Sequence, residues 1–198
     1  MYEALTDHGY EVYVYGKTTG GVSTQMDNVV ESLDGLPLMD FSLVNHRTCL
    51  QDVLSSGIGG KVIFTMHGTA PNLEQPLEGA DVYVSVSEEI QRHAARKGFA
   101  SVVIPNAVDM ERFKDYSPVH SKLERVLLLS NYEAARSVVS EACAIGGYSF
   151  DYVGGDKSVI AVENAINNAD LVVTVGRGVI ESLACGRNVL IYDNRTYN

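Results

Sequence analysis

A regular alternation between short apolar runs and longer helical segments restricts this chain to few folds. The apolar runs are rich in β-branched and aliphatic residues and recur about every 20 residues, the spacing expected of strand–helix–strand units. Several runs are apolar on both faces, which is typical of parallel strands covered by helices on each side. We expect strands within residues 11–16, 39–45, 61–68, 81–87, 101–106, 125–131, 148–155, 170–176 and 188–193. The pattern therefore predicts an α/β protein built on doubly wound parallel sheets.

The order of the elements predicts two Rossmann-like domains, both incomplete. A polar stretch between Phe113 and Lys122 contains a proline and is predicted to be a linker. We accordingly place the domains at residues 1–117 and 118–198. The first is expected to lack its opening strand, because the chain starts with a helix that stops at Gly9. The second is expected to lack its C-terminal part, because the sequence ends just after a strand.

Charge and composition exclude several classes of partner and site. The 198 residues carry a formal net charge of −10, which disfavours nucleic acid, because a polyphosphate surface requires a basic footprint. The five histidines show no paired spacing of the kind that binds zinc, so we expect no metal site. Because the N-terminus has no signal-peptide pattern and no apolar run reaches about 20 residues, we expect a cytoplasmic protein and leave peripheral membrane contact open.

The segment 169–193 is the strongest candidate for a ligand site. A predicted strand ends at Val175, glycines at 176 and 178 allow a tight turn, and a helix follows. The N-terminus of a helix offers unpaired N–H groups and a positive dipole, so it can seat a diphosphate. Arg177 could add positive charge there, and we expect Glu181 in the first helical turn, where its carboxylate could bind a ribose diol. Spacing alone leaves open that Glu181 is an ordinary surface residue near the helix dipole.

The same segment resembles the donor-binding stretch of the GT-B glycosyltransferases, particularly the large retaining family 4. In that family a Gly-containing loop precedes a motif of the form E-A-x-A-x-G-x-P-V, and Glu181, Ala184, Gly186 and Val189 fit it, with Asn188 in place of the proline. Further segments resemble other motifs of the family in the family's own order. They are LTDHGYEVYVYG, KVIFTMHG, DVYVSVSEEIQRHAARKG, SVVIPNAVDMERF and YSFDYVGGD.

The resemblance implies roles for particular residues. Glu181 would bind the donor ribose, and the backbone from Gly176 through Arg177, Gly178 and Val179 would line the diphosphate. His67, at the end of KVIFTMHG, would lie near the reacting sugar as the catalytic histidine. An ordinary loop histidine bonded to a neighbouring carbonyl is the alternative.

Two positions depart from the family's motifs. Val173 stands where the family usually has a second glutamate, and the basic pair that follows the first strand of its second domain is reduced to Arg136. Arg177 is therefore our candidate for a substitute cation on the diphosphate.

The function that the resemblance implies is transfer of a sugar from a nucleotide-diphosphate donor to an acceptor hydroxyl, with retention and without a metal. The acceptor could be a glycan, a lipid or a small molecule, and the nucleotide sugar is a substrate, so no separate cofactor is expected. Two alternatives stay open: a non-catalytic remnant or fragment that only binds nucleotide sugars, and a sugar-nucleotide epimerase of the same fold.

Overall fold

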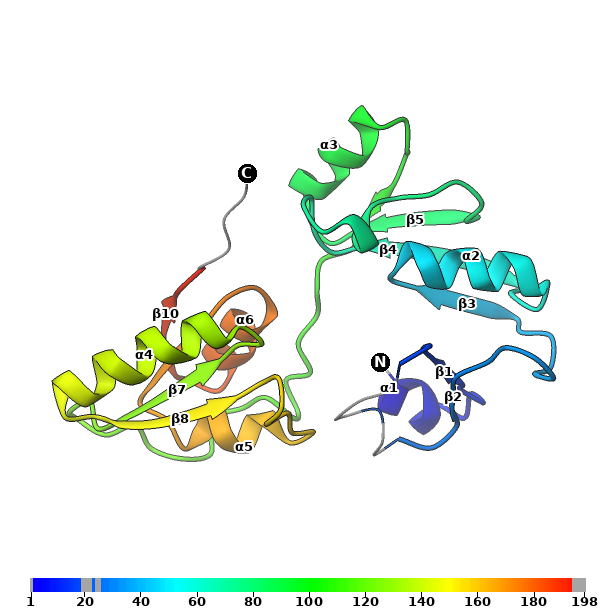
Figure 1. Cartoon of the computed structure of the whole chain (residues 1–198). Coiled ribbons are helices and arrows are strands. Elements are labelled where there is room, and N and C mark those ends of the chain that lie inside the picture. Colours follow the sequence, from blue (N-terminus) through cyan, green and yellow to red (C-terminus); the bar gives the residue numbers. More distant parts are fainter. Residues whose placement is uncertain (1, 19–22, 24–25, 194–198) are drawn as a thin grey trace. The chain divides into compact units, whose positions relative to one another are not determined.

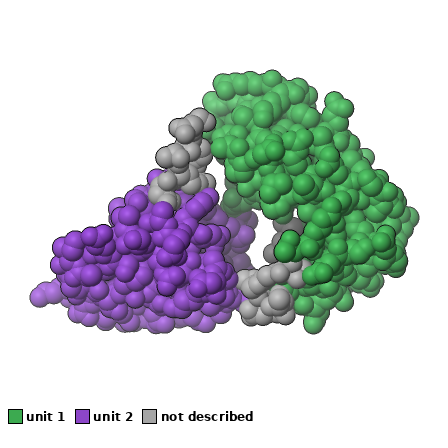
Figure 2. Space-filling model, in the orientation of Figure 1, with its two compact units in different colours: residues 1–106 green, residues 107–198 purple. Residues whose placement is uncertain are grey.

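The computed structural model of the protein describes residues 2–18, 23 and 26–193. The chain forms two compact units, unit 1 (1–106) and unit 2 (107–198), which are coloured separately in Figure 2. Each unit contains a four-stranded parallel sheet flanked by helices, so the predicted α/β class is confirmed and the architecture is consistent with Rossmann-like folds. None of the described helices has the length and apolar character needed to cross a bilayer.

Unit 1 holds a sheet of order β3-β4-β5-β6 and a separate parallel pair, β1-β2 (Figure 1). The strands are β1 (Val14–Tyr15), β2 (Val29–Val30), β3 (Phe41–Val44), β4 (Lys61–Met66), β5 (Val82–Ser85) and β6 (Val102–Val103). The helices are α1 (Tyr2–Asp7), α2 (Arg47–Ser56), the short 3-10 turn η2 (Asn72–Glu74) and α3 (Glu88–Arg96). Each run predicted as a strand in this unit contains one, and only β2 lies outside the predicted runs.

The core of unit 1 lies on one face of its larger sheet. The buried residues of β3 and β4 pack against α2 and α3. They are Val44, Val62, Phe64 and Met66 on the strands, with Leu50, Val53, Ile90 and Ala94 on the helices. Phe41 and Leu43 point to the opposite face, because side chains alternate along a strand, and they are 60% and 47% exposed. The strand order follows the chain order without reversal, so successive right-handed crossovers place α2 and α3 on the same side; the doubly wound arrangement predicted for this domain is not seen in this sheet.

Unit 2 has a sheet of order β10-β9-β7-β8, with all neighbours parallel. The strands are β7 (Arg125–Leu129), β8 (Ser149–Val153), β9 (Leu171–Thr174) and β10 (Asn188–Ile191). The helices are α4 (Glu133–Gly146), α5 (Val162–Asn167) and α6 (Arg177–Ala184). All four predicted strands are present.

Both faces of the unit 2 sheet are covered. The chain runs from β7 outward to β8, and then crosses to the other side of β7 for β9 and β10, which puts the helices on opposite faces. Val126 and Leu128 of β7 pack with α4, whereas Leu127, one residue out of phase, packs with α5 and the end of α6. Unit 2 is therefore doubly wound, as predicted.

The segment 107–117 packs with unit 2, so the units divide about ten residues before the predicted boundary at 117/118. Phe113 is only 2% exposed and belongs to the core of unit 2. Arg112 pairs with Glu163 of α5 at 2.9 Å, and the Arg187 side chain, with no exposed surface, pairs with Asp115. The partners Glu163 and Arg187 lie far along the chain from this segment, which is why a polar, proline-containing sequence resembled a linker.

Asp170, just before β9, binds the stretch 118–125, which comes next after the segment 107–117, to the sheet. Its side chain is 3% exposed and accepts hydrogen bonds from the N–H groups of His120 (3.1 Å), Glu124 (3.1 Å) and Arg125 (2.8 Å). Burial alone would raise the pKa of Asp170, but these N–H groups, with the His120 ring, outweigh it and lower the pKa from 3.8 to about 2. The ionised carboxylate is therefore the form that the fold favours.

We predict that Asp170 makes unit 2 acid-sensitive. The pKa of Asp170 is lower in the folded than in the unfolded protein, so its stabilisation of the fold is complete above about pH 4 and is lost as the pH falls through about 2. The difference between the two pKa values corresponds to about 2 kcal/mol of folding free energy. Replacing Asp170 by Asn should lower the free energy of unfolding by this order at pH 7 and flatten its decline between pH 4 and 2, measured by hydrogen exchange of β7 and β9 amides. The exposed Asp156→Asn is the control; an unchanged pH profile in Asp170→Asn would contradict the assignment.

Candidate functional site

The predicted donor turn lies where the strand order of unit 2 reverses. The chain leaves β7 toward β8 on one side and later returns to β9 on the other, so the carboxyl ends of β7 and β9 flank a topological switch point. Open α/β sheets bind ligands in the crevice outside the carboxyl ends of strands at such a point. The loop after β9 begins at Val175, which places Gly176 at this edge.

The two glycines of the turn have different structural roles. Gly176 adopts φ 69° and ψ −130° and forms the N-cap of α6, a conformation that favours glycine because φ is positive. Gly178 lies inside the first turn of α6, where a Cβ atom would approach Thr174 Oγ1 to 2.5 Å. Thr174 in turn donates from Oγ1 to the carbonyl of Leu129 at 3.0 Å. Gly178 thus allows α6 to pack closely on β9.

Glu181 lies one turn further along α6 than the sequence predicted. The helix starts at Arg177, so its first turn contains no acidic residue, and Glu181 is the fourth residue after the first. Side chains on a helix lean toward its N-terminus, and the Glu181 carboxylate reaches back to accept a hydrogen bond from Arg177 Nε at 2.6 Å. Glu181 is 12% exposed at its side chain and Arg177 is 59% exposed. The two predicted donor-binding side chains therefore form an ion pair.

The start of α6 carries backbone donors. The N–H group of Val179 donates to the carbonyl of Gly176 at 3.2 Å. Within the part of the chain that the structure describes, the N–H groups of Arg177 and Gly178 have no acceptor. Among the described residues no side chain caps this end of the helix, so the N–H groups of Arg177 and Gly178 stay available for an anion.

Asn131 and Gly154 shape the same edge, although neither was predicted to be a site residue. The Gly155 N–H donates to Asn131 Oδ1 at 2.9 Å, which joins the loop after β7 to the loop after β8. Gly154 has φ 139°, and a Cβ atom there would lie 2.0 Å from the Ser130 carbonyl oxygen. The glycine pair in YVGGD was a visible signal of this close approach, whereas nothing in the sequence singled out Asn131.

His67 belongs to unit 1 and follows β4 at its carboxyl end. Its Nε2 atom lies 3.3 Å from Oδ1 of Asn45, which follows the neighbouring strand β3. With the Asn45 amide oriented this way its oxygen can only accept, so the contact is made by the tautomer that carries a proton on Nε2. Asn45 was not predicted as a site residue, and only its position one residue after β3 could have indicated it.

The positions that depart from the family's motifs have structural explanations. Val173 is 2% exposed in the interior of β9, where a carboxylate would be costly. Arg136 lies over the Tyr152 ring, 4.7 Å from its centroid, and pairs with Glu133 at 3.5 Å. Among the described residues no group of three or more His, Cys, Asp or Glu side chains is arranged to hold a metal ion.

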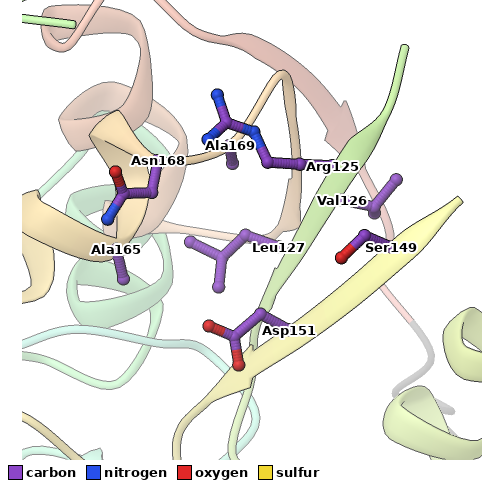
Figure 3. A pocket seen from close by; sticks show the side chains of 8 residues that line it. All are labelled: Arg125, Val126, Leu127, Ser149, Asp151, Ala165, Asn168 and Ala169. Carbon is purple, nitrogen blue, oxygen red and sulfur yellow. The ribbon is translucent and has the colours of Figure 1, made fainter.

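Two cavities lie at the amino ends of the unit 2 strands, away from the donor turn. One, of about 160 Å³, is lined by residues that include Arg125, Ser149 and Asn168 (Figure 3), where the Arg125 side chain extends toward Asn168. The other, of about 230 Å³, borders Asp170 and residues 119–123. Neither is lined by a residue predicted to bind the donor.

Comparison with known proteins adds no assignment to this geometry. No protein-family model matches the chain, and no curated protein matches it either. Any function must therefore be argued from the residues at the carboxyl edges of the two sheets.

Proposed function

We propose that this protein binds a nucleotide-diphosphate sugar at the start of α6 and belongs functionally with the GT-B glycosyltransferases. The observation that carries the proposal is the position of the turn at Gly176. It lies at the switch point of a doubly wound sheet, and it opens a helix with two N–H groups that have no acceptor among the described residues. Diphosphates bind at such helix starts because N–H groups and the helix dipole both favour negative charge.

In this proposal different residues of unit 2 contact different parts of the donor. The N–H groups of Arg177 and Gly178 contact the diphosphate, and the Arg177 guanidinium adds charge-assisted hydrogen bonds. The Glu181 carboxylate accepts hydrogen bonds from the ribose hydroxyls. It already leans toward the helix start, so binding requires Arg177 to exchange its carboxylate partner for phosphate oxygens.

The same groups would assist the transfer step. The bond between the anomeric carbon and the diphosphate breaks, and the acceptor oxygen forms the new bond while its proton leaves with the diphosphate. Donors held in place at the leaving oxygens stabilise the charge that develops there. His67, held by Asn45 at the carboxyl end of β4, is the proposed hydrogen-bonding partner of the reacting sugar.

A binding protein without transferase activity is the second candidate, and Val173 favours it. This valine is buried in β9 at the position of the family's second glutamate, so the site would keep its donor contacts without that carboxylate. Calorimetric titration with nucleoside diphosphates, run beside a donor-hydrolysis assay, separates the two candidates. Binding with turnover supports the enzyme, binding without turnover supports the remnant, and the absence of binding contradicts both.

Arg177 gives a specific prediction for this site. If its guanidinium contacts the diphosphate, Arg177→Ala should weaken nucleoside-diphosphate binding about tenfold, and Arg177→Lys should recover part of the loss. Lys122→Ala, an exposed cation at the amino end of the sheet, is the control and should bind normally. Unchanged or tighter binding in Arg177→Ala would show that Arg177 only occupies Glu181.

A further inference from the structure

One buried amide, that of Gln75, makes four hydrogen bonds at the loop that follows His67. Gln75 is 7% exposed and closes the segment 67–75, which leaves β4 at its carboxyl end and contains η2. Its Nε2 donates to the carbonyls of Thr69 at 3.0 Å and Pro71 at 3.1 Å. The side chain thus turns the segment back on itself through two main-chain contacts.

The oxygen of the same amide binds the end of α3. Gln75 Oε1 accepts hydrogen bonds from His93 Nε2 at 2.8 Å and from Lys97 Nζ. An amide has two donor hydrogens and two acceptor positions, so all four are used. Lysine only donates and the two carbonyls only accept, so the network fixes the orientation of the amide and requires a proton on His93 Nε2. Satisfied buried networks of this kind are rigid, and leaving any member unpaired is costly.

We propose that Gln75 is a positioning residue for His67. By fixing residues 69 and 71 to α3, it restrains the chain directly behind the imidazole, so that His67 keeps its contact with Asn45 at the edge of the sheet. A second hydrogen bond restrains the loop: Arg47 Nη1 donates to Asn72 Oδ1 at 3.1 Å. The proposal rests on the role proposed for His67, but the restraint itself can be measured without any sugar donor.

Two substitutions test the restraint. Gln75→Leu removes all four hydrogen bonds at similar volume, and Gln75→Glu keeps an acceptor for His93 and Lys97 while it cannot donate to the carbonyls at neutral pH. In both, the amides of Glu74 and Gln75, which donate to the Pro71 and Asn72 carbonyls, should exchange with solvent at least about tenfold faster, while those of β4 stay protected. The control is Gln91→Leu, which breaks a side-chain bond from α3 to the Ser101 carbonyl (2.7 Å) and should leave the loop unchanged.

The decisive readout is the His67 ring itself. Nitrogen NMR of the imidazole should show the Nε2-protonated form in the wild-type protein and in Gln91→Leu, and a mixture of tautomers in both Gln75 variants. Faster loop exchange with an unchanged His67 signal would overturn the positioning role, as would unchanged exchange. If donor turnover is found, the Gln75 variants should lower kcat and leave the donor KM nearly unchanged. If no turnover is found, the transferase proposal fails, but amide exchange and the His67 ring signal still test the positioning role of Gln75.

Discussion

Replacing Arg187 by Met is expected to destabilise unit 2 by about 3–5 kcal/mol, enough to leave much of this unit unfolded. The Arg187 side chain has no exposed surface. Its Nη2 donates to the carbonyl and to Oδ1 of Asn167, each at 3.0 Å, and to the carbonyl of Ser117, while Nη1 contacts Asp115 Oδ1 at 3.3 Å. Methionine fills part of the space but takes this donor away from Asn167, which is 1% exposed, and unpairing a buried acceptor costs more than the contact itself contributes.

Hydrogen exchange of the β7 and β9 amides under increasing urea measures this effect in unit 2 alone. Lys114→Met is a suitable control, because Lys114 is 58% exposed and lies 4.0 Å from its partner Glu111; we expect a change of less than about 0.5 kcal/mol. In Arg187→Met the protection of unit 2 should fall while that of β4 in unit 1 is retained. A loss below about 1 kcal/mol would show that Arg187 is not what holds residues 107–117 to unit 2.

Replacing Glu181 by Gln is expected to weaken binding of a nucleoside diphosphate roughly 10- to 100-fold, the effect of removing a charged acceptor from hydroxyl donors. The fold should tolerate the change, because the carboxylate's partner Arg177 is 59% exposed and such pairs contribute up to about 1 kcal/mol. Titration calorimetry gives the affinity, and urea unfolding gives the stability of the same sample.

Glu141→Gln provides the matched control for this substitution, since Glu141 is an exposed residue of α4. Its affinity should equal that of the wild-type protein. A Glu181→Gln variant that binds as well as the wild type would leave Glu181 as a partner of Arg177 only and would remove the ribose contact from the proposal.

Local sequence patterns predicted much of the fold. Ser87 is of a residue type that favours helix starts, and it caps α3, where its Oγ accepts a hydrogen bond from the Ile90 N–H at 3.3 Å. The apolar runs gave every strand of the four-stranded sheets, because burial on a parallel sheet requires such runs. The short pair partner β2 escaped detection, since Val29–Val30 is too brief for any periodicity to show.

Features that depend on distant partners could not be predicted. The boundary between the units lies earlier in the chain than predicted, because Arg187 binds residues about 70 positions before it. The helix start at Arg177 followed from the positive φ of Gly176, which moved Glu181 beyond the first turn and into reach of Arg177. Gln75 and Asn45 carry no sequence signature, because an amide acquires its role only from the groups that the fold brings to it.

The most direct test of the central claim is an NMR titration of the backbone amides with a series of nucleoside diphosphates. We predict that the N–H signals of Arg177 and Gly178 shift most and saturate together with the largest changes elsewhere in α6. Saturable shifts confined to the amino end of the sheet, around Arg125 or Asp170, or no saturable shift with any nucleotide, would contradict a donor site at the start of α6.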